Sequence, residues 1–159
     1  MRQTNSRTIL AVDSDQRTRT LLEITLNAEG YQAYVVGDPD AAFDVLELFP
    51  DIVLFDDATF GPTVTDFIAH ARSLEPHPDM IFMSTRPDTA VVARKLGVRI
   101  SIVKPFDPTR LFQLVTSCPR FTTTGTMISP AVQDEPPNTI PMPKTTNHRR
   151  ISGRSQQQR

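Results

Sequence analysis

The hydrophobic positions of residues 8–118 alternate between continuous runs and spaced pairs. Four to six apolar residues, with few polar interruptions, follow one another at Ile9–Val12, Ile52–Phe55, Met80–Met83 and Ile100–Val103, and more weakly at Tyr31–Val36. Such runs are typical of strands buried on both faces of a parallel sheet. The pattern therefore predicts five strands.

Between these runs, apolar residues recur at helical spacing. The pairs and triplets are Leu22/Leu26, Phe43/Leu46, Phe67/Ala71/Leu74, Val92/Leu96 and Leu111/Val115. Spacings of three and four residues place them on one face of a helix. Asp38-Pro39 and Asp107-Pro108 have the form of helix starts, and Gly30 and Gly97 stand where helices should end. Five strand–helix units predict an α/β fold, with a parallel sheet covered by helices on both faces.

The ends of the chain have a different character. Residues 119–159 contain six of the 14 prolines, many Thr, Ser and Gln, and no sustained apolar period. Such a segment buries too little apolar surface to offset its chain entropy. We therefore expect one domain over residues 8–118, a flexible N-terminus over 1–7 and a disordered basic tail over 119–159. The tail is too short and proline-rich for a DNA-binding domain.

Charge and cysteine content narrow the class of protein. Residues 1–118 carry 11 basic and 16 acidic side chains, so this part of the sequence lacks the excess of basic residues that is typical of a nucleic-acid-binding surface. Cys118 is the single cysteine, a usage that fits a reducing compartment. The polar N-terminus lacks the apolar core of a signal peptide, and no apolar run approaches the length of a membrane span. We expect a cytoplasmic protein without membrane partners.

Polar side chains follow four of the predicted strands. These residues are Asp13, Asp56, Ser84 and Lys104. Ligands of open parallel sheets bind beyond the carboxyl ends of the strands, so these side chains should meet. A carboxylate beside a divalent cation can attack a phosphoryl group, and an ammonium and a hydroxyl can hold the remaining phosphoryl oxygens. Singly, each residue reads as a cap or a solvated strand end; the ordered set favours phosphoryl chemistry.

The chain resembles the receiver domains of two-component response regulators. The matching stretches are ILAVDSDQRTR (9–19), PDIVLFDD (50–57), MIFMST (80–85) and IVKPFDPTRL (102–111). They cover about two-thirds of the chain, and the lysine followed by Pro-Phe-Asp is the most specific feature. The resemblance implies a flavodoxin-like (βα)5 fold with strand order 2-1-3-4-5.

The resemblance also implies a role for each strand-end residue. Asp56 would be the phosphoacceptor, and Asp13 would hold Mg²⁺ together with Asp56. Ser84 would be the hydroxyl that follows the phosphoryl group, and Lys104 would pair with that group or with Asp56. The bond from Lys104 to Pro105 would be cis.

Several positions depart from the family pattern. Ser14 stands where the second acid of the Mg²⁺ site is usual, so we expect weak metal binding. Asp15 fits the start of a helix, and Asp57 is expected to be a solvated loop acid. The loop over 58–67 lacks the usual proline–glycine pair. Ser101 replaces the aromatic switch residue of the family and cannot bury a comparable apolar area.

These residues bear on three possible functions. The first is a response regulator that accepts a phosphoryl group from a histidine kinase or phosphotransfer protein. It would signal to a separate protein through the face made by the fourth helix, fifth strand and fifth helix. The alternative is a pseudo-receiver that works without phosphorylation because Ser14 weakens the Mg²⁺ site. The third, a haloacid-dehalogenase phosphatase, is rejected because Asp56-Asp57 precedes Lys104 and Arg17 replaces the expected threonine. We expect no enzyme.

Overall fold

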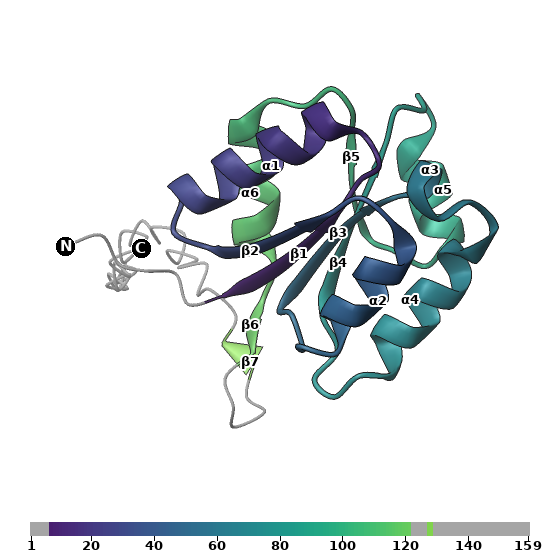
Figure 1. The fold of residues 1–159 in the computed structure, drawn as a ribbon, viewed down its shortest axis with the longest axis horizontal. Coiled ribbons are helices and arrows are strands. Elements are labelled where there is room, and N and C mark those ends of the chain that lie inside the picture. The colour runs from purple at the N-terminus through teal and green to yellow at the C-terminus, as the bar shows by residue number, and fades with distance from the viewer. Residues whose placement is uncertain (1–6, 122–126, 129–159) are drawn as a thin grey trace, which may run out of the picture. The chain divides into compact units, whose positions relative to one another are not determined.

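The computed structural model describes residues 7–121 and 127–128. A five-stranded parallel sheet forms the centre of this part of the chain (Figure 1). Its strands are β1 (Thr8–Val12), β2 (Gln32–Val36), β3 (Ile52–Asp56), β4 (Asp79–Ser84) and β5 (Ile100–Val103). They lie in the order β2-β1-β3-β4-β5. Both the five predicted strands and the flavodoxin-like order are confirmed.

Helices connect the strands. They are α1 (Gln16–Ala28), α2 (Pro39–Leu46), α3 (Asp57–Phe60), the 3-10 helix η1 (Gly61–Thr63), α4 (Val64–Ser73), α5 (Thr89–Lys95) and α6 (Pro108–Ser117). The five helices predicted from apolar spacing correspond to α1, α2, α4, α5 and α6. The expectation of a loop after Asp56 was wrong, because α3 begins directly at the end of β3.

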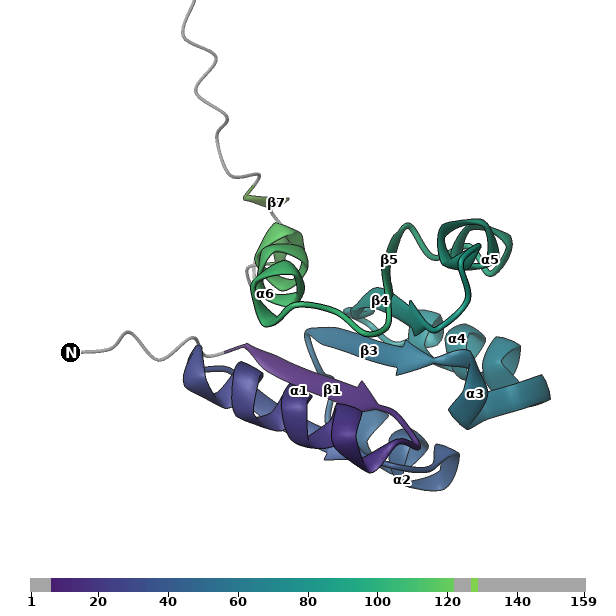
Figure 2. The same ribbon diagram turned by 90° about the horizontal axis from the view of Figure 1, so that it is seen from above.

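Two apolar cores lie on opposite faces of the sheet. Figure 2 shows α1 and α6 in front of the sheet and α2 and α4 behind it. Alternate residues of each strand enter one core or the other: Leu54 packs with residues of α1 and α6, whereas Val53 and Phe55 pack with α2, α4 and α5. All five residues of β3 are buried, as expected for a central strand covered on both faces. This burial holds the strand ends in fixed positions.

The predicted helix boundaries have clear physical causes. The side chains of Asp15, Asp38 and Asp107 each accept a hydrogen bond from a backbone N–H in the first turn of the following helix. Gly30 and Gly97 have φ values of 83° and 73°, in the region that favours glycine at helix ends. These positions were read correctly from local sequence.

Beyond α6, the described residues include one short antiparallel pair of strands, β6 (Arg120–Phe121) and β7 (Met127–Ile128). No strand was predicted there. Residues 122–126 and 129–159 of the expected tail, and residues 1–6 of the expected flexible N-terminus, lie outside the described residues. Within the part that is described, no helix is long and apolar enough to cross a membrane.

Candidate functional site

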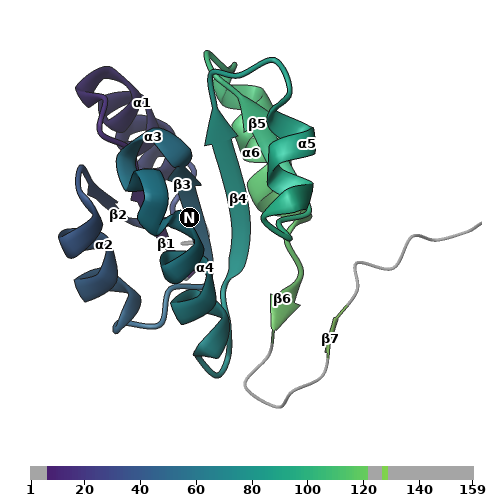
Figure 3. The ribbon, with the colours of Figure 1, turned by 90° about the vertical axis from the view of Figure 1, so that its right-hand side faces the viewer.

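Strand register brings the four strand-end residues to one edge of the sheet. Asp56 ends β3 and Ser84 ends β4, whereas Asp13 and Lys104 directly follow β1 and β5. Figure 3 shows β4 between β3 and β5, with the carboxyl ends of the strands at the same edge. Asp13 and Lys104 remain tied to the sheet, because their backbone N–H groups donate to Val36 and Ser84. The predicted clustering is confirmed.

Lys104 links the two carboxylates. Its Nζ lies 2.7 Å from Oδ2 of Asp13 and 3.1 Å from Oδ2 of Asp56. The side chains of both acids are at most 2% exposed, and that of Lys104 is 11% exposed. Burial lowers the pKa of Lys104, but the hydrogen bonds and negative charges of Asp13 and Asp56 outweigh it, so this pKa is raised. Lys104 is therefore a fixed cation between two buried anions. Its bond to Pro105 is cis, as the resemblance implies.

The remaining carboxylate oxygens are also engaged. Oδ1 of Asp13 accepts the backbone N–H of Asp15 at 2.8 Å. Oδ1 of Asp56 accepts the backbone N–H of Thr59 at 3.2 Å and also the Thr59 hydroxyl. All four oxygens of the two acids thus accept hydrogen bonds from the protein itself.

Thr59 is a member of the site that sequence reasoning missed. It lies half-buried in α3, and its Oγ1 also accepts the backbone N–H of Ser14 at 2.7 Å. A local signal was present, since Asp56 precedes Thr59 by three residues and a carboxylate in that position can cap a helix. The family resemblance instead implied a loop over residues 58–67.

Ser14 contributes through its backbone. Ser14 is exposed. Its backbone N–H donates to Oγ1 of Thr59, and its backbone carbonyl accepts a hydrogen bond from the Arg19 guanidinium at 2.8 Å. Arg19 also donates to the carbonyl of Asp13 at 2.8 Å. Arg19 therefore holds the β1–α1 connection in place, a role that sequence reasoning did not assign.

The two predicted serines occupy different depths in the sheet. Ser84 is 1% exposed at the site edge, where its Oγ accepts the backbone N–H of Arg86 at 3.2 Å. Ser101 is half-buried in the interior of β5 and pairs with Phe82 of β4. Ser84 is thus at the predicted edge, whereas Ser101 lies before the carboxyl end of β5 and is less buried than Ser84.

The residues at this edge fit Mg²⁺ in kind but not in number. Carboxylate oxygens are suitable ligands, and Asp13 and Asp56 supply them. Among the residues described, no three His, Cys, Asp or Glu side chains form a group that could hold a metal ion. An ion bound by Asp13 and Asp56 would have to compete with the hydrogen bonds from Lys104 and Thr59.

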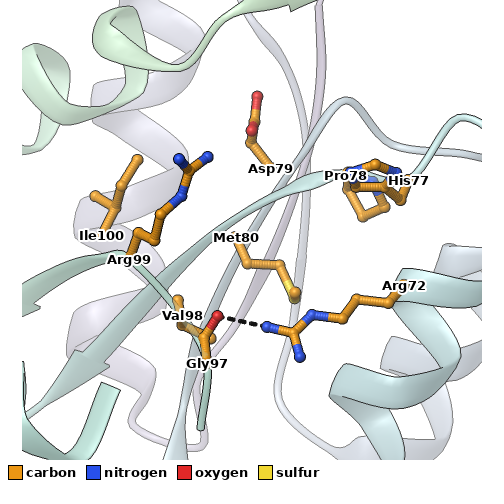
Figure 4. Close-up of a pocket in the computed structure, with 9 residues that line it drawn as sticks. All are labelled: Arg72, His77, Pro78, Asp79, Met80, Gly97, Val98, Arg99 and Ile100. Carbon is orange, nitrogen blue, oxygen red and sulfur yellow. Dashed lines mark hydrogen bonds between the residues drawn. The ribbon is translucent and has the colours of Figure 1, made fainter. Parts of the chain in front are cut away.

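A separate pocket of about 360 Å³ lies at the opposite ends of β4 and β5. Figure 4 shows Asp79 and Arg99 on one side of Met80 and Arg72 on the other, with Arg72 bonded to the carbonyl of Gly97. Asp79 and Ile100 begin their strands, whereas Ser84 and Lys104 lie at the other end. This pocket is therefore distinct from the strand-end site.

Known proteins with similar sequences are response regulators. The chain is 34% identical over 106 residues to the DNA-binding response regulator MtrA of Mycobacterium tuberculosis, over 65% of this chain and 46% of MtrA. MtrA of Mycobacterium leprae matches at the same identity over 47% of its length. The chain thus spans about half the length of the curated relatives it matches. No model of a known protein family matches the chain.

Solved structures share the fold. The chemotaxis response regulator CheY4 of Vibrio cholerae has a TM-score of 0.63 and 21% identity, over 72% of this chain and 99% of that chain. A response regulator from Thermotoga maritima has a TM-score of 0.63 and 22% identity, over 71% and 97%. At 21–22% identity, the similarity to these two structures concerns the fold alone. The similarity in sequence is to MtrA, at 34% identity. Together with the strand order and the clustered strand ends, these similarities support a response-regulator receiver domain over the described part of the chain.

Proposed function

We propose that the chain is a phosphorelay signal transduction response regulator whose Asp56 accepts a phosphoryl group from a histidine kinase or phosphotransfer protein. The observation that carries this proposal is the convergence of Asp56, Asp13 and Lys104 in direct contact at one buried edge. In this role the chain is a phosphoacceptor in the cytoplasm and not an enzyme.

Each residue has a chemical task in this proposal. An oxygen of Asp56 attacks phosphorus and forms an aspartyl phosphate, while the bond from phosphorus to the donor breaks. Lys104 gives up its contact with Oδ2 of Asp56 and pairs with the new phosphoryl oxygens. The buried Ser84 hydroxyl gives up its hydrogen bond with the backbone N–H of Arg86 and turns toward the same oxygens. Asp13 and Asp56 would hold Mg²⁺, which neutralises charge on the phosphoryl group.

Output would pass through protein contacts on the face made by α5, β5 and α6. Two exposed apolar side chains support this choice: Val91 in α5 is 41% exposed and Val103 in β5 is 47% exposed. Ser101 lies in the same strand, and a serine there can hydrogen-bond but cannot move a ring. The aspartyl phosphate would act by shifting the balance between two arrangements of this face.

A pseudo-receiver that works without phosphorylation is the second candidate. It is favoured by the closed hydrogen bonding of the site, in which all four carboxylate oxygens of Asp13 and Asp56 already have protein donors. In that case the same α5–β5–α6 face would bind a partner constitutively.

Intact-mass measurement after incubation with acetyl phosphate separates the two candidates. We expect a gain of one phosphoryl group that depends on Mg²⁺ and is absent in Asp56→Asn. The half-buried Asp57 offers a neighbouring carboxylate, so Asp57→Asn is the matched control and should still be labelled. If wild type gains nothing at any Mg²⁺ concentration, the pseudo-receiver is correct.

A further inference from the structure

We propose that Thr59 is a positioning residue that holds Asp56 in a closed arrangement and slows its phosphorylation. This inference rests on the proposed function, because it concerns access to the phosphoacceptor. Its basis is a chain of two hydrogen bonds across the mouth of the site. The Ser14 N–H donates to Oγ1 of Thr59 at 2.7 Å, and the Thr59 hydroxyl donates to Oδ1 of Asp56.

The position of Thr59 is set by its helix and by the core beneath it. Asp56 is the N-cap residue of α3, so its Oδ1 also accepts the Thr59 N–H at 3.2 Å. The next residue, Phe60, is 3% exposed and stacks on Phe67 with ring centroids 4.2 Å apart. Phe60 thus anchors α3 to the core, and Thr59 is carried over the carboxylate.

The hydrogen bonds of Thr59 link the β1–α1 loop to α3, and these two segments would have to admit the phosphoryl group. Ser14 belongs to the β1–α1 connection, which Arg19 fixes through the carbonyls of Asp13 and Ser14. Thr59 belongs to α3, which directly follows β3. While the hydroxyl bridges these two segments, it occupies one side of Asp56, and Lys104 occupies the other.

The transfer step shows what the hydroxyl must release. With acetyl phosphate, a bond forms between a carboxylate oxygen of Asp56 and phosphorus, and the bond from phosphorus to the acetate oxygen breaks. Acetate leaves with that electron pair, and no proton is transferred. A hydrogen bond to the charged carboxylate stabilises the starting state and withdraws electron density from the attacking group. Thr59 must therefore rotate away before or during the attack.

Three substitutions of Thr59 test this role. Thr59→Val keeps the shape of the side chain and removes the hydroxyl, and Thr59→Ala removes it in a residue with a high helix propensity. Thr59→Ser retains the hydroxyl and should restore the wild-type behaviour. The matched control is Thr65→Val, because Thr65 is an exposed threonine in α4.

The first measurement is the initial rate of phosphorylation by acetyl phosphate, followed by intact mass at fixed Mg²⁺. Loss of a hydrogen bond to a charged group should raise the rate about tenfold in Thr59→Val and Thr59→Ala. Thr59→Ser should be as slow as wild type, and Thr65→Val should be unchanged. Equal or lower rates in folded Thr59→Val and Thr59→Ala would overturn the proposal.

The second measurement is hydrogen exchange of the Ser14 amide by NMR, without Mg²⁺ or phosphoryl donor. We expect its protection to fall in Thr59→Val and Thr59→Ala and to persist in Thr59→Ser. Unchanged protection in all variants would show that the bridge does not form, which overturns the proposal independently of phosphorylation. A third outcome is that protection changes as expected while neither wild type nor any variant is phosphorylated. In that case the hydrogen-bonded bridge exists, the proposed phosphoacceptor function is wrong, and the role of Thr59 in slowing phosphorylation is wrong with it.

Discussion

Nζ of Lys104 lies 2.7 Å from Oδ2 of Asp13, although the two residues are 91 positions apart in the chain. The contact joins the residue after β1 to the residue after β5, across the width of the intervening strands. Because Lys104 also contacts Asp56 at 3.1 Å, one ammonium group compensates two buried carboxylates. The site thus contains its own cation.

Replacing Lys104 should therefore destabilise the fold. Lys104→Met would leave Asp13 and Asp56 buried without a cation, and breaking a buried ion pair in this way costs about 3 kcal/mol or more. We expect that loss in the free energy of unfolding at pH 7, measured by urea denaturation. Lys95 is exposed, so Lys95→Met is the matched control. Similar losses in both variants would contradict the role of Lys104.

The pH dependence of this difference follows from the raised pKa of Lys104. A base with a raised folded-state pKa contributes its full stabilisation below the unfolded value, here the ordinary 10.5, and loses it as the pH rises through the folded pKa. The stability gap between wild type and Lys104→Met should stay constant from pH 7 to 9 and shrink above about pH 10.5. Urea denaturation at each pH measures the gap. A gap that shrinks already between pH 7 and 9 would contradict the raised pKa.

Ser14→Asp should strengthen metal binding. It would add a third carboxylate beside Asp13 and Asp56, and carboxylate oxygens are preferred by Mg²⁺. We expect the apparent Mg²⁺ affinity to rise about tenfold, equivalent to roughly 1.4 kcal/mol. The measurement is the Mg²⁺ dependence of the melting temperature.

The neutral control for this change is Ser14→Asn. It alters the side chain at the same position without adding charge and should respond to Mg²⁺ as wild type does. In the absence of Mg²⁺, Ser14→Asp should melt below wild type, because it places a third negative charge near two others. Equal Mg²⁺ responses of the Asp and Asn variants would show that Ser14 does not face the metal site.

Asp79→Asn should not destabilise the protein at neutral pH. Among the described side chains, Oδ2 of Asp79 is a buried oxygen without a hydrogen-bond partner, and the Arg7 guanidinium lies 4.0 Å away. Burial raises the pKa of Asp79, more than the positive charges of Arg7, His77 and Arg99 lower it. Its ionisation therefore weakens the folded state.

For an acid with a raised pKa, stability falls as the pH rises from the ordinary value of 3.8 through the folded-state pKa. Asp79→Asn should thus match wild type near pH 3.5 and be more stable than wild type at pH 7. Thermal melts at both pH values measure this difference, with exposed Asp44→Asn as control. A less stable Asp79→Asn at pH 7 would mean that the ion pair with Arg7 outweighs burial.

Cys118 should be unreactive in the native protein. It is 3% exposed, and burial raises its pKa to about 11. At pH 8, alkylation by iodoacetamide should be about 100-fold slower than in urea, because the thiolate is the reacting species. Cys118 is the single cysteine of the chain, so mass gain reports on it alone. Equal rates in native and denatured protein would contradict its burial.

Much of this molecule follows from local sequence. The apolar runs that became β1, β3 and β4 carry their own burial pattern, because a central parallel strand must be apolar on both faces. Asp38 and Asp107 mark helix starts by a hydrogen bond to a residue two or three positions away. The ends of the strands were therefore predictable, and with them the meeting of Asp13, Asp56 and Lys104 at one edge.

Only the tertiary structure determines which residues form hydrogen bonds with one another at that edge. Phe60 is buried against Phe67, and this packing accompanies a helix, α3, directly after Asp56, where the family resemblance implied a loop. The helix in turn places Thr59 between Asp56 and Ser14. Thr59 and Ser14 are 45 positions apart in the chain. Apolar periodicity reports burial within one element, but a hydrogen bond between a loop and a helix from another part of the chain depends on where the core anchors each of them. For that reason the residues of the site were predictable and their bonding was not.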